Sequence, residues 1–172
     1  MRDNIVLIGM PGVGKSTIGV ILAKVMGYEF VDSDLVIQKK EGRLLKDIIA
    51  SEGIDGFIAV ENAVNSELNV HNSIIATGGS VVYGEEAMAH LASIGTIVYI
   101  RQSLDVLSDR LSDINGRGVV LKDGQTLDDL YEERCRLYEK YSDITVDEEG
   151  LSIEQTLNKI VTSLQLYFTP VN

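Results

Sequence analysis

The sequence predicts an α/β fold in which helices cover both faces of a parallel sheet of five strands. Short runs rich in β-branched or aromatic residues have the continuous apolar character of strands buried on both faces, and they cover residues 5–8, 28–31, 73–76, 96–100 and 144–146. Segments of helical period lie around them, at 16–26, 44–51, 56–69, 85–93, 104–112, 127–141 and 153–164. Strands that alternate with helices imply right-handed crossovers, which place a ligand at the carboxyl ends of the strands.

The composition favours a single domain spanning residues 1–172, because 45% hydrophobic content is ample for one core. A net charge of −11 argues against a nucleic-acid or anionic-membrane surface, since such surfaces need clustered Lys and Arg. Neither a membrane-spanning stretch nor a signal peptide is recognisable. Cys135 is the only cysteine, and His71 and His90 lack metal-ligand spacing. We therefore expect a cytoplasmic monomer with no nucleic-acid or membrane partner.

The first predicted strand runs directly into a glycine-rich turn that opens a helix. Residues 9–16 read G-M-P-G-V-G-K-S and fit the phosphate-binding P-loop pattern G-x-x-x-x-G-K-S/T. In such a turn, backbone N–H groups and the positive end of the helix dipole converge on one anion. Lys15 can reach the β- and γ-phosphates, and the Ser16 hydroxyl can bind Mg²⁺. The motif predicts a three-layer P-loop NTPase sandwich that binds a nucleoside triphosphate through Gly12, Val13, Gly14, Lys15, Ser16 and Thr17.

Two further strand ends carry residues suited to catalysis and substrate binding. Asp32 and Asp34 follow the second strand, where one carboxylate can orient Mg²⁺ and the other can accept a proton from an attacking hydroxyl. The structural alternative, compatible with these roles, is that one of them caps the following helix. Gly78 and Gly79 follow the third strand and let backbone N–H groups approach a substrate, unless they form only a turn.

Arginines are placed where phosphoryl transfer needs positive charge. Residues 113–124 carry three glycines between two helices, and we interpret them as a mobile lid that holds Arg117. Arg110 and Arg134 lie on the flanking helices, where a solvated surface role is the alternative. Positive groups that approach as a lid closes would stabilise charge on the transferred phosphoryl group.

Taken together, these motifs resemble the shikimate kinase family, a branch of the small P-loop kinases, over residues 4 to about 146. The family carries a D-S/T-D element after the P-loop, matched by residues 32–34, and a G-G-G turn, matched in part by residues 78–80. Its R-x-x-L-Y element matches residues 134–138.

The resemblance implies roles for single residues. Asp32 would serve the Mg²⁺ shell, and Asp34 would hold and deprotonate the substrate hydroxyl. Arg110 would stack on adenine, Arg117 would act from the lid, and Arg134 would bind the substrate carboxylate.

The chain departs from the family pattern at three places, of which Ile58 bears most directly on the acceptor. The substrate-binding helix region, about residues 33–69, carries F-R-x-x-E in the family, but this chain has Ile58 between Phe57 and Glu61. The arginine that would grip a carboxylate and pair with the glutamate is therefore missing, unless Arg136 replaces it. Ser80 stands at the third glycine of the turn. The lid reads R-G-V-V where the family usually has R-P-L-L.

The sequence thus predicts a kinase that uses ATP and Mg²⁺ to phosphorylate a hydroxyl of a small metabolite, with shikimate the leading acceptor. Lys15, Asp34 and Arg117 are the predicted catalytic residues, and Phe57, Gly78, Gly79 and Arg134 join Asp34 in the acceptor site. One alternative is the same chemistry on another hydroxy acid or polyol such as gluconate. The other is a nucleotide-binding regulatory protein with a degraded acceptor pocket.

Overall fold

A computed structural model describes residues 2–112, 121–122 and 124–169 of the chain. Within these residues five parallel strands form one sheet in the order β2-β3-β1-β4-β5. The strands are β1 (Asn4–Ile8), β2 (Glu29–Asp32), β3 (Ser73–Ala76), β4 (Gly95–Arg101) and β5 (Ile144–Asp147). All five residues of the central strand β1 are buried, as expected for a strand covered on both faces.

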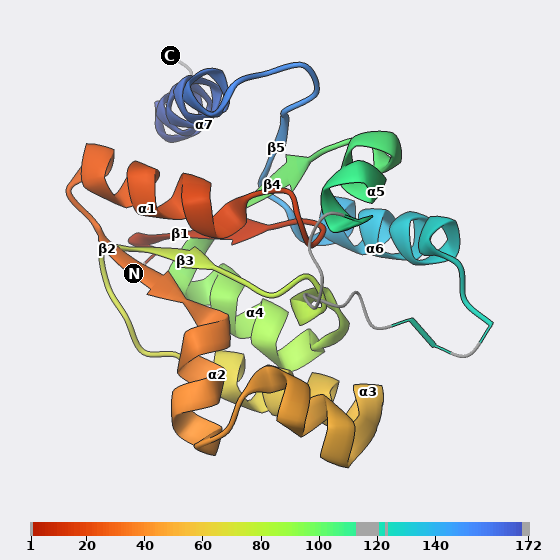
Figure 1. The fold of residues 1–172 in the computed structure, drawn as a ribbon. Coiled ribbons are helices and arrows are strands. Elements are labelled where there is room, and N and C mark those ends of the chain that lie inside the picture. The colour runs from red at the N-terminus through yellow and green to blue at the C-terminus, as the bar shows by residue number, and fades with distance from the viewer. Residues whose placement is uncertain (1, 113–120, 123, 170–172) are drawn as a thin grey trace.

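Helices separate the strands, as the sequence predicts. They are α1 (Lys15–Met26), α2 (Ser33–Glu41), α3 (Leu45–Ser66), the short 3₁₀ helix η1 (Val81–Tyr83), α4 (Glu85–Ile94), α5 (Leu104–Ser112), α6 (Leu127–Tyr141) and α7 (Ile153–Phe168). Helices α1 and α7 lie on one side of the sheet and α4 on the other, with α3 packed against α4 and α2 packed against α3 (Figure 1). The expected α/β sandwich with a five-stranded parallel sheet is confirmed.

The helix region between β2 and β3 has a small apolar cluster of its own. Ile37, Ile48 and Val64 are buried there, with half-buried side chains around them, and the main core lies against the sheet. This packing holds α2 and α3 together beside the carboxyl ends of β2 and β3, where an acceptor site is expected.

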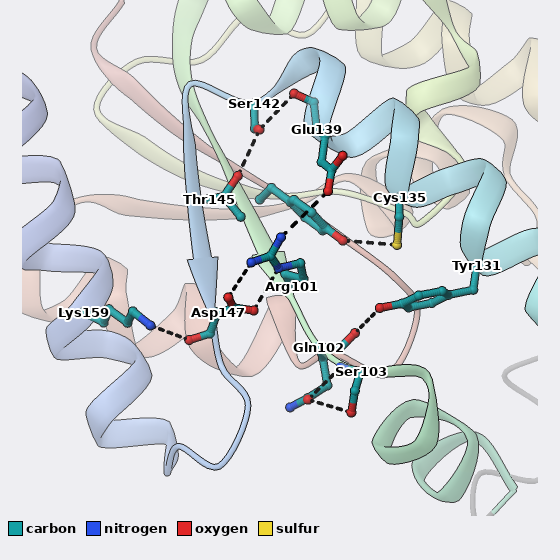
Figure 2. Close-up of polar contacts among 11 residues, drawn as sticks. Arg101, Gln102, Ser103, Tyr131, Cys135, Glu139, Ser142, Thr145, Asp147 and Lys159 are labelled. Carbon is teal, nitrogen blue, oxygen red and sulfur yellow. Dashed lines mark hydrogen bonds and ion pairs between the residues drawn. The ribbon is translucent and has the colours of Figure 1, made fainter.

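Polar contacts fasten α6 and α7 to the end of the sheet (Figure 2). The Arg101 guanidinium on β4 donates to Asp147 on β5 at 2.9 Å, and Lys159 of α7 donates to the Asp147 carbonyl at 2.9 Å. The Tyr131 hydroxyl of α6 donates to the Gln102 carbonyl at 2.8 Å. These bonds fix the position of α6, which carries one of the predicted site arginines.

Some element boundaries differ from the sequence prediction. Helix α2 had no predicted bounds, although a helix capped by Asp32 or Asp34 was considered, because only Ser33 and Ile37 of its residues are buried and its apolar periodicity is weak. The segments expected at 44–51 and 56–69 form the single element α3 with a break at Gly53, whose φ is 72°. No described helix is long and apolar enough to cross a membrane.

Candidate active site

The P-loop leaves the first turn of α1 open to an anion. Gly12 and Gly14 have φ of 82° and 94°, in the left-handed region that favours glycine. Gly14 is the N-cap of α1 and provides no side-chain hydrogen bond to the helix. The N–H groups of that first turn are therefore available to phosphate oxygens, as the sequence motif predicts.

Lys15 lies folded against the loop that it belongs to. Its ammonium donates to the carbonyl oxygens of Gly9 and Met10, at 2.7 and 3.0 Å, and the residue is only 7% exposed. Burial lowers the pKa of Lys15 to about 8, although Asp34 opposes that shift. An incoming triphosphate would favour the protonated ammonium and hold it among phosphate oxygens.

Ser16 and Asp32 bring two oxygen ligands together at the edge of the P-loop. The Ser16 hydroxyl donates to Asp32 Oδ2 at 2.9 Å, and Asp32 Oδ1 accepts from the Asp34 N–H at 3.0 Å as the N-cap of α2. The capping alternative is thus correct for Asp32 and leaves its other oxygen beside Ser16. Mg²⁺ binds through one or two protein oxygens plus phosphate oxygens, and this pair fits that pattern. In the described part of the chain no group of three His, Cys, Asp or Glu side chains could hold a metal.

The turn after β3 brings the predicted acceptor residues to the P-loop. A Cβ added to Gly78 would lie 3.1 Å from Asp34 Oδ1, so only glycine leaves this space open. A Cβ added to Gly79 would lie 2.6 Å from Pro11 of the P-loop and 3.0 Å from an Arg134 nitrogen. Asp34 and Arg134 therefore border the same turn, next to the phosphate site.

Arg134 is held inside the protein on α6. It is 7% exposed, its Nε donates to the Tyr83 hydroxyl at 3.4 Å, and its guanidinium lies 5.4 Å from the centre of the Tyr83 ring. A solvated surface role, the alternative considered from the sequence, does not apply to it. One residue of the same motif, Tyr138, donates its hydroxyl to the Gly79 carbonyl at 2.6 Å and supports the turn.

Glu61 is a fully buried carboxyl at this site. It is 1% exposed, and its Oε2 accepts from the Ser80 hydroxyl at 2.5 Å. Burial is the largest cause that raises the pKa of Glu61 to about 7, and the nearby charge of Asp34 adds to it. The sequence pattern showed only that Glu61 lacks its expected arginine; its burial and its bond to Ser80 required the structure.

A cavity of about 140 Å³ lies beside the P-loop, and Val13, Gly14, Thr17 and Ile18 form one of its walls. Arg110, Glu148, Leu151, Ile153 and Thr156 form the remainder. The Arg110 guanidinium donates to the Gly12 carbonyl at 3.2 Å and to Glu148 Oε1 at 2.8 Å. Sequence reasoning missed Glu148. The signal that could have found it is its position immediately after the last strand, at the carboxyl edge of the sheet.

The structure gives the surroundings of several other residues that the sequence analysis singled out. Phe57 packs against the apolar cluster of α2 and α3. The Arg136 side chain is 81% exposed and lies 3.9 Å from Glu132 one turn earlier on α6, so it does not replace the missing arginine. Ile58 is half-buried. Arg117 and most of the predicted lid at 113–124 fall outside the described residues.

Comparisons with known proteins agree with this geometry. The family model described as shikimate kinase matches residues 11–165. A shikimate kinase of Francisella tularensis is 38% identical over 165 residues, which cover 94% of each chain.

Solved structures of shikimate kinases are also similar to this chain. Shikimate kinase from Acinetobacter baumannii in complex with shikimate superposes with a TM-score of 0.86 at 28% identity, over 99% of this chain and 97% of that one. Shikimate kinase from Aquifex aeolicus has a TM-score of 0.77 at 34% identity, over 94% and 96% of the two chains. The chain therefore belongs to the shikimate kinase family and is a small-molecule kinase.

Proposed function

We propose that this protein transfers the γ-phosphoryl group of ATP to a hydroxyl of a small metabolite, with shikimate as the first candidate and shikimate 3-phosphate as its product. The observation that carries the proposal is the glycine turn after β3. Asp34 and Arg134 border it, and Pro11 of the P-loop lies against it. A hydroxyl held by Asp34 is thus a neighbour of a phosphate held by the P-loop. The shikimate complex of the Acinetobacter baumannii relative supports the choice of acceptor.

In the proposed reaction the acceptor oxygen forms a bond to the γ-phosphorus, and the bond from that phosphorus to the β-bridging oxygen breaks, which releases ADP. Asp34 orients the acceptor hydroxyl and takes its proton. Lys15 and the P-loop N–H groups bind the β- and γ-phosphates. Arg134 binds a carboxylate of the acceptor as a bidentate partner. For Arg117 the sequence-based prediction stands: from the lid, it stabilises charge on the transferred phosphoryl group.

Mg²⁺ is part of the proposal, with Ser16 and Asp32 as the residues that would hold it. When bound, it neutralises charge on the β- and γ-phosphate oxygens. We also propose one kinase domain that acts as a cytoplasmic monomer. Size-exclusion chromatography with light scattering would test the monomer.

A second acceptor class is favoured by Ile58 and by the exposed position of Arg136. Arg134 is the arginine that the described part of the chain places at the glycine turn. A charge-assisted hydrogen bond contributes about 1.5–3 kcal/mol. The missing arginine should therefore lower the affinity for a carboxylate-bearing acceptor by about tenfold or more. The alternative is the same reaction on another small hydroxy acid or polyol such as gluconate, and the missing arginine favours a polyol without a carboxylate over gluconate.

The test measures ADP release by the purified protein with ATP, Mg²⁺ and a panel that includes shikimate and gluconate. We expect turnover with at least one acceptor and none for Lys15→Met, which keeps the length of the side chain but loses its charge. Ile58→Arg should improve turnover of shikimate if the pocket accepts another compound, and it should change little if shikimate is already used well. No turnover with any acceptor would refute the proposed function.

A further inference from the structure

Tyr83 lies against the buried arginine of the acceptor site. It ends η1, the short helix that follows the glycine turn and packs against α3, α4 and α6. Its hydroxyl accepts from Arg134 Nε at 3.4 Å, and the centre of its ring lies 5.4 Å from the guanidinium carbon. Tyr83 belongs to none of the motifs on which the family resemblance rests, so sequence reasoning did not single it out.

Arg134 needs a partner that does not neutralise it. The residue is 7% exposed, and a buried guanidinium has lost much of the hydration that stabilises its charge. A carboxylate in contact would stabilise that charge, but it would also occupy the N–H donors that an acceptor carboxylate requires. Tyr83 offers a phenol oxygen and the negative face of a ring, which stabilise the cation and leave its net charge unchanged.

The hydroxyl of Tyr83 is suited to accept from Arg134. Burial, followed by a hydrogen bond to Glu133, raises the pKa of Tyr83, and Arg134 opposes that shift. The phenol therefore keeps its proton at neutral pH. Because the proton is shared with the Glu133 carboxylate, the lone pairs of the phenol oxygen remain for Arg134.

The contact also decides which edge of the guanidinium is left for a ligand. A carboxylate can pair either with Nε and one terminal nitrogen or with both terminal nitrogens. Nε is bonded to Tyr83, and the terminal nitrogen Nη1 lies 3.0 Å from the position of a Cβ added to Gly79. The edge with the two terminal nitrogens therefore reaches the glycine turn, where the acceptor is expected.

We propose that Tyr83 is a positioning residue for the acceptor, which holds Arg134 through Nε and directs its two terminal nitrogens toward an anionic group of the acceptor. This inference rests on the proposed function and adds a residue of η1 to its specificity. Ile58 makes the role more important, because the arginine that would share a carboxylate is missing. The strength of the grip then depends on how well Arg134 is oriented.

The first experiment observes the contact without any ligand. In ¹⁵N NMR spectra the Arg134 Nε–H signal is assigned by its loss in Arg134→Lys, and its exchange with water is measured near neutral pH. We expect exchange at least about tenfold faster in Tyr83→Phe than in wild type, because the acceptor of this N–H is gone. Tyr131→Phe removes a hydroxyl that bonds the Gln102 carbonyl elsewhere on α6, and it should leave the exchange unchanged.

The second experiment measures what the positioning does for binding. Shikimate and its methyl ester, which lacks the carboxylate charge, are titrated into the Mg²⁺–ADP complex by calorimetry. Loss of the charge should cost wild type about tenfold or more in affinity but Tyr83→Leu about threefold or less, since Arg134 is no longer held toward the ligand. Tyr83→Phe keeps the ring and should fall between them.

Kinetics separate positioning from folding. In Tyr83→Phe the KM for shikimate should rise, while kcat and the KM for ATP stay within about twofold of wild type. A variant that is merely destabilised would lose active protein and lower kcat without this split. Tyr131→Phe should match wild type in all three constants.

Unchanged Nε–H exchange in Tyr83→Phe would overturn the inference. An equal cost of the methyl ester in wild type and Tyr83→Leu would also overturn it, as would wild-type binding of neither compound. The exchange and binding measurements need no turnover. If both give the expected results but no acceptor in the panel is phosphorylated, the proposed function fails and the role of Tyr83 stands; turnover of shikimate with unchanged exchange has the opposite meaning.

Discussion

The buried carboxyl of Glu61 should make the stability of the protein depend on pH, and Glu61→Gln should remove that dependence. The pKa of this group is raised from 4.5 to about 7 in the folded state, with burial as the largest cause. Between these values the folded protein keeps a proton that the unfolded chain has released. The stability associated with this proton is therefore fully present below pH 4.5 and is lost as pH rises through 7.

The size of the effect follows from the two pKa values. Their difference corresponds to about 3 kcal/mol of unfolding free energy, at about 1.4 kcal/mol for each factor of ten. Roughly 2 kcal/mol of this should be lost between pH 5.5 and pH 8.5, a range that avoids the isoelectric region near 4.5. Glutamine has nearly the same shape and can accept from Ser80, but it does not ionise. Relative to wild type, Glu61→Gln should therefore gain about 2 kcal/mol across this range.

Urea unfolding of both proteins at pH 5.5, 7 and 8.5, in the absence of nucleotide, measures this gain directly. Glu149→Gln removes the same charge from an exposed residue, so its offset from wild type should stay below about 0.5 kcal/mol and should not change with pH. Parallel stability profiles for wild type and Glu61→Gln would refute the reasoning, because they would mean that the folded protein does not shift the ionisation of this carboxyl.

Three further predictions concern the nucleotide site. Because burial lowers the pKa of Lys15 to about 8, ATP binding at pH 8.5 should take up about three quarters of a proton. Calorimetry in two buffers of different ionisation enthalpy should then give different heats, and identical heats would contradict this prediction. Arg110 borders the cavity beside the P-loop and is held there by Glu148. If this cavity receives the nucleoside, Glu148→Ala should weaken ATP binding about tenfold by calorimetry, while Glu149→Ala should change it little. A Cβ added at Gly9 would lie 2.6 Å from a backbone oxygen of β4, so Gly9→Ala should cost at least about 2 kcal/mol in urea unfolding. Gly27→Ala, at φ of 70° with open space around it, should cost only about 1 kcal/mol; an equal cost would exclude the steric explanation.

Sequence reasoning was strongest where the relevant information is local. The order of strands and helices follows from apolar periodicity, and the P-loop follows from residues that are adjacent in the chain. The sequence placed Asp32 and Asp34 at the end of β2 and left open which of them caps the following helix; the structure assigns the cap to Asp32, whose other oxygen lies beside Ser16. Sequence reasoning was weaker for α2, since a helix with only two buried residues carries little apolar periodicity.

By itself the sequence determined the parallel α/β fold, the phosphate site at residues 9–16 and the absence of an arginine at Ile58. Only the tertiary structure decided that Arg136 faces solvent, that Glu148 holds Arg110 and that Glu61 bonds Ser80 over the glycine turn. Helix periodicity does not specify which partner a side chain meets when it is brought together with residues from distant elements. Burial is set by that same packing, in which α3 and α6 both lie against η1, and burial is what changes the chemistry of Glu61.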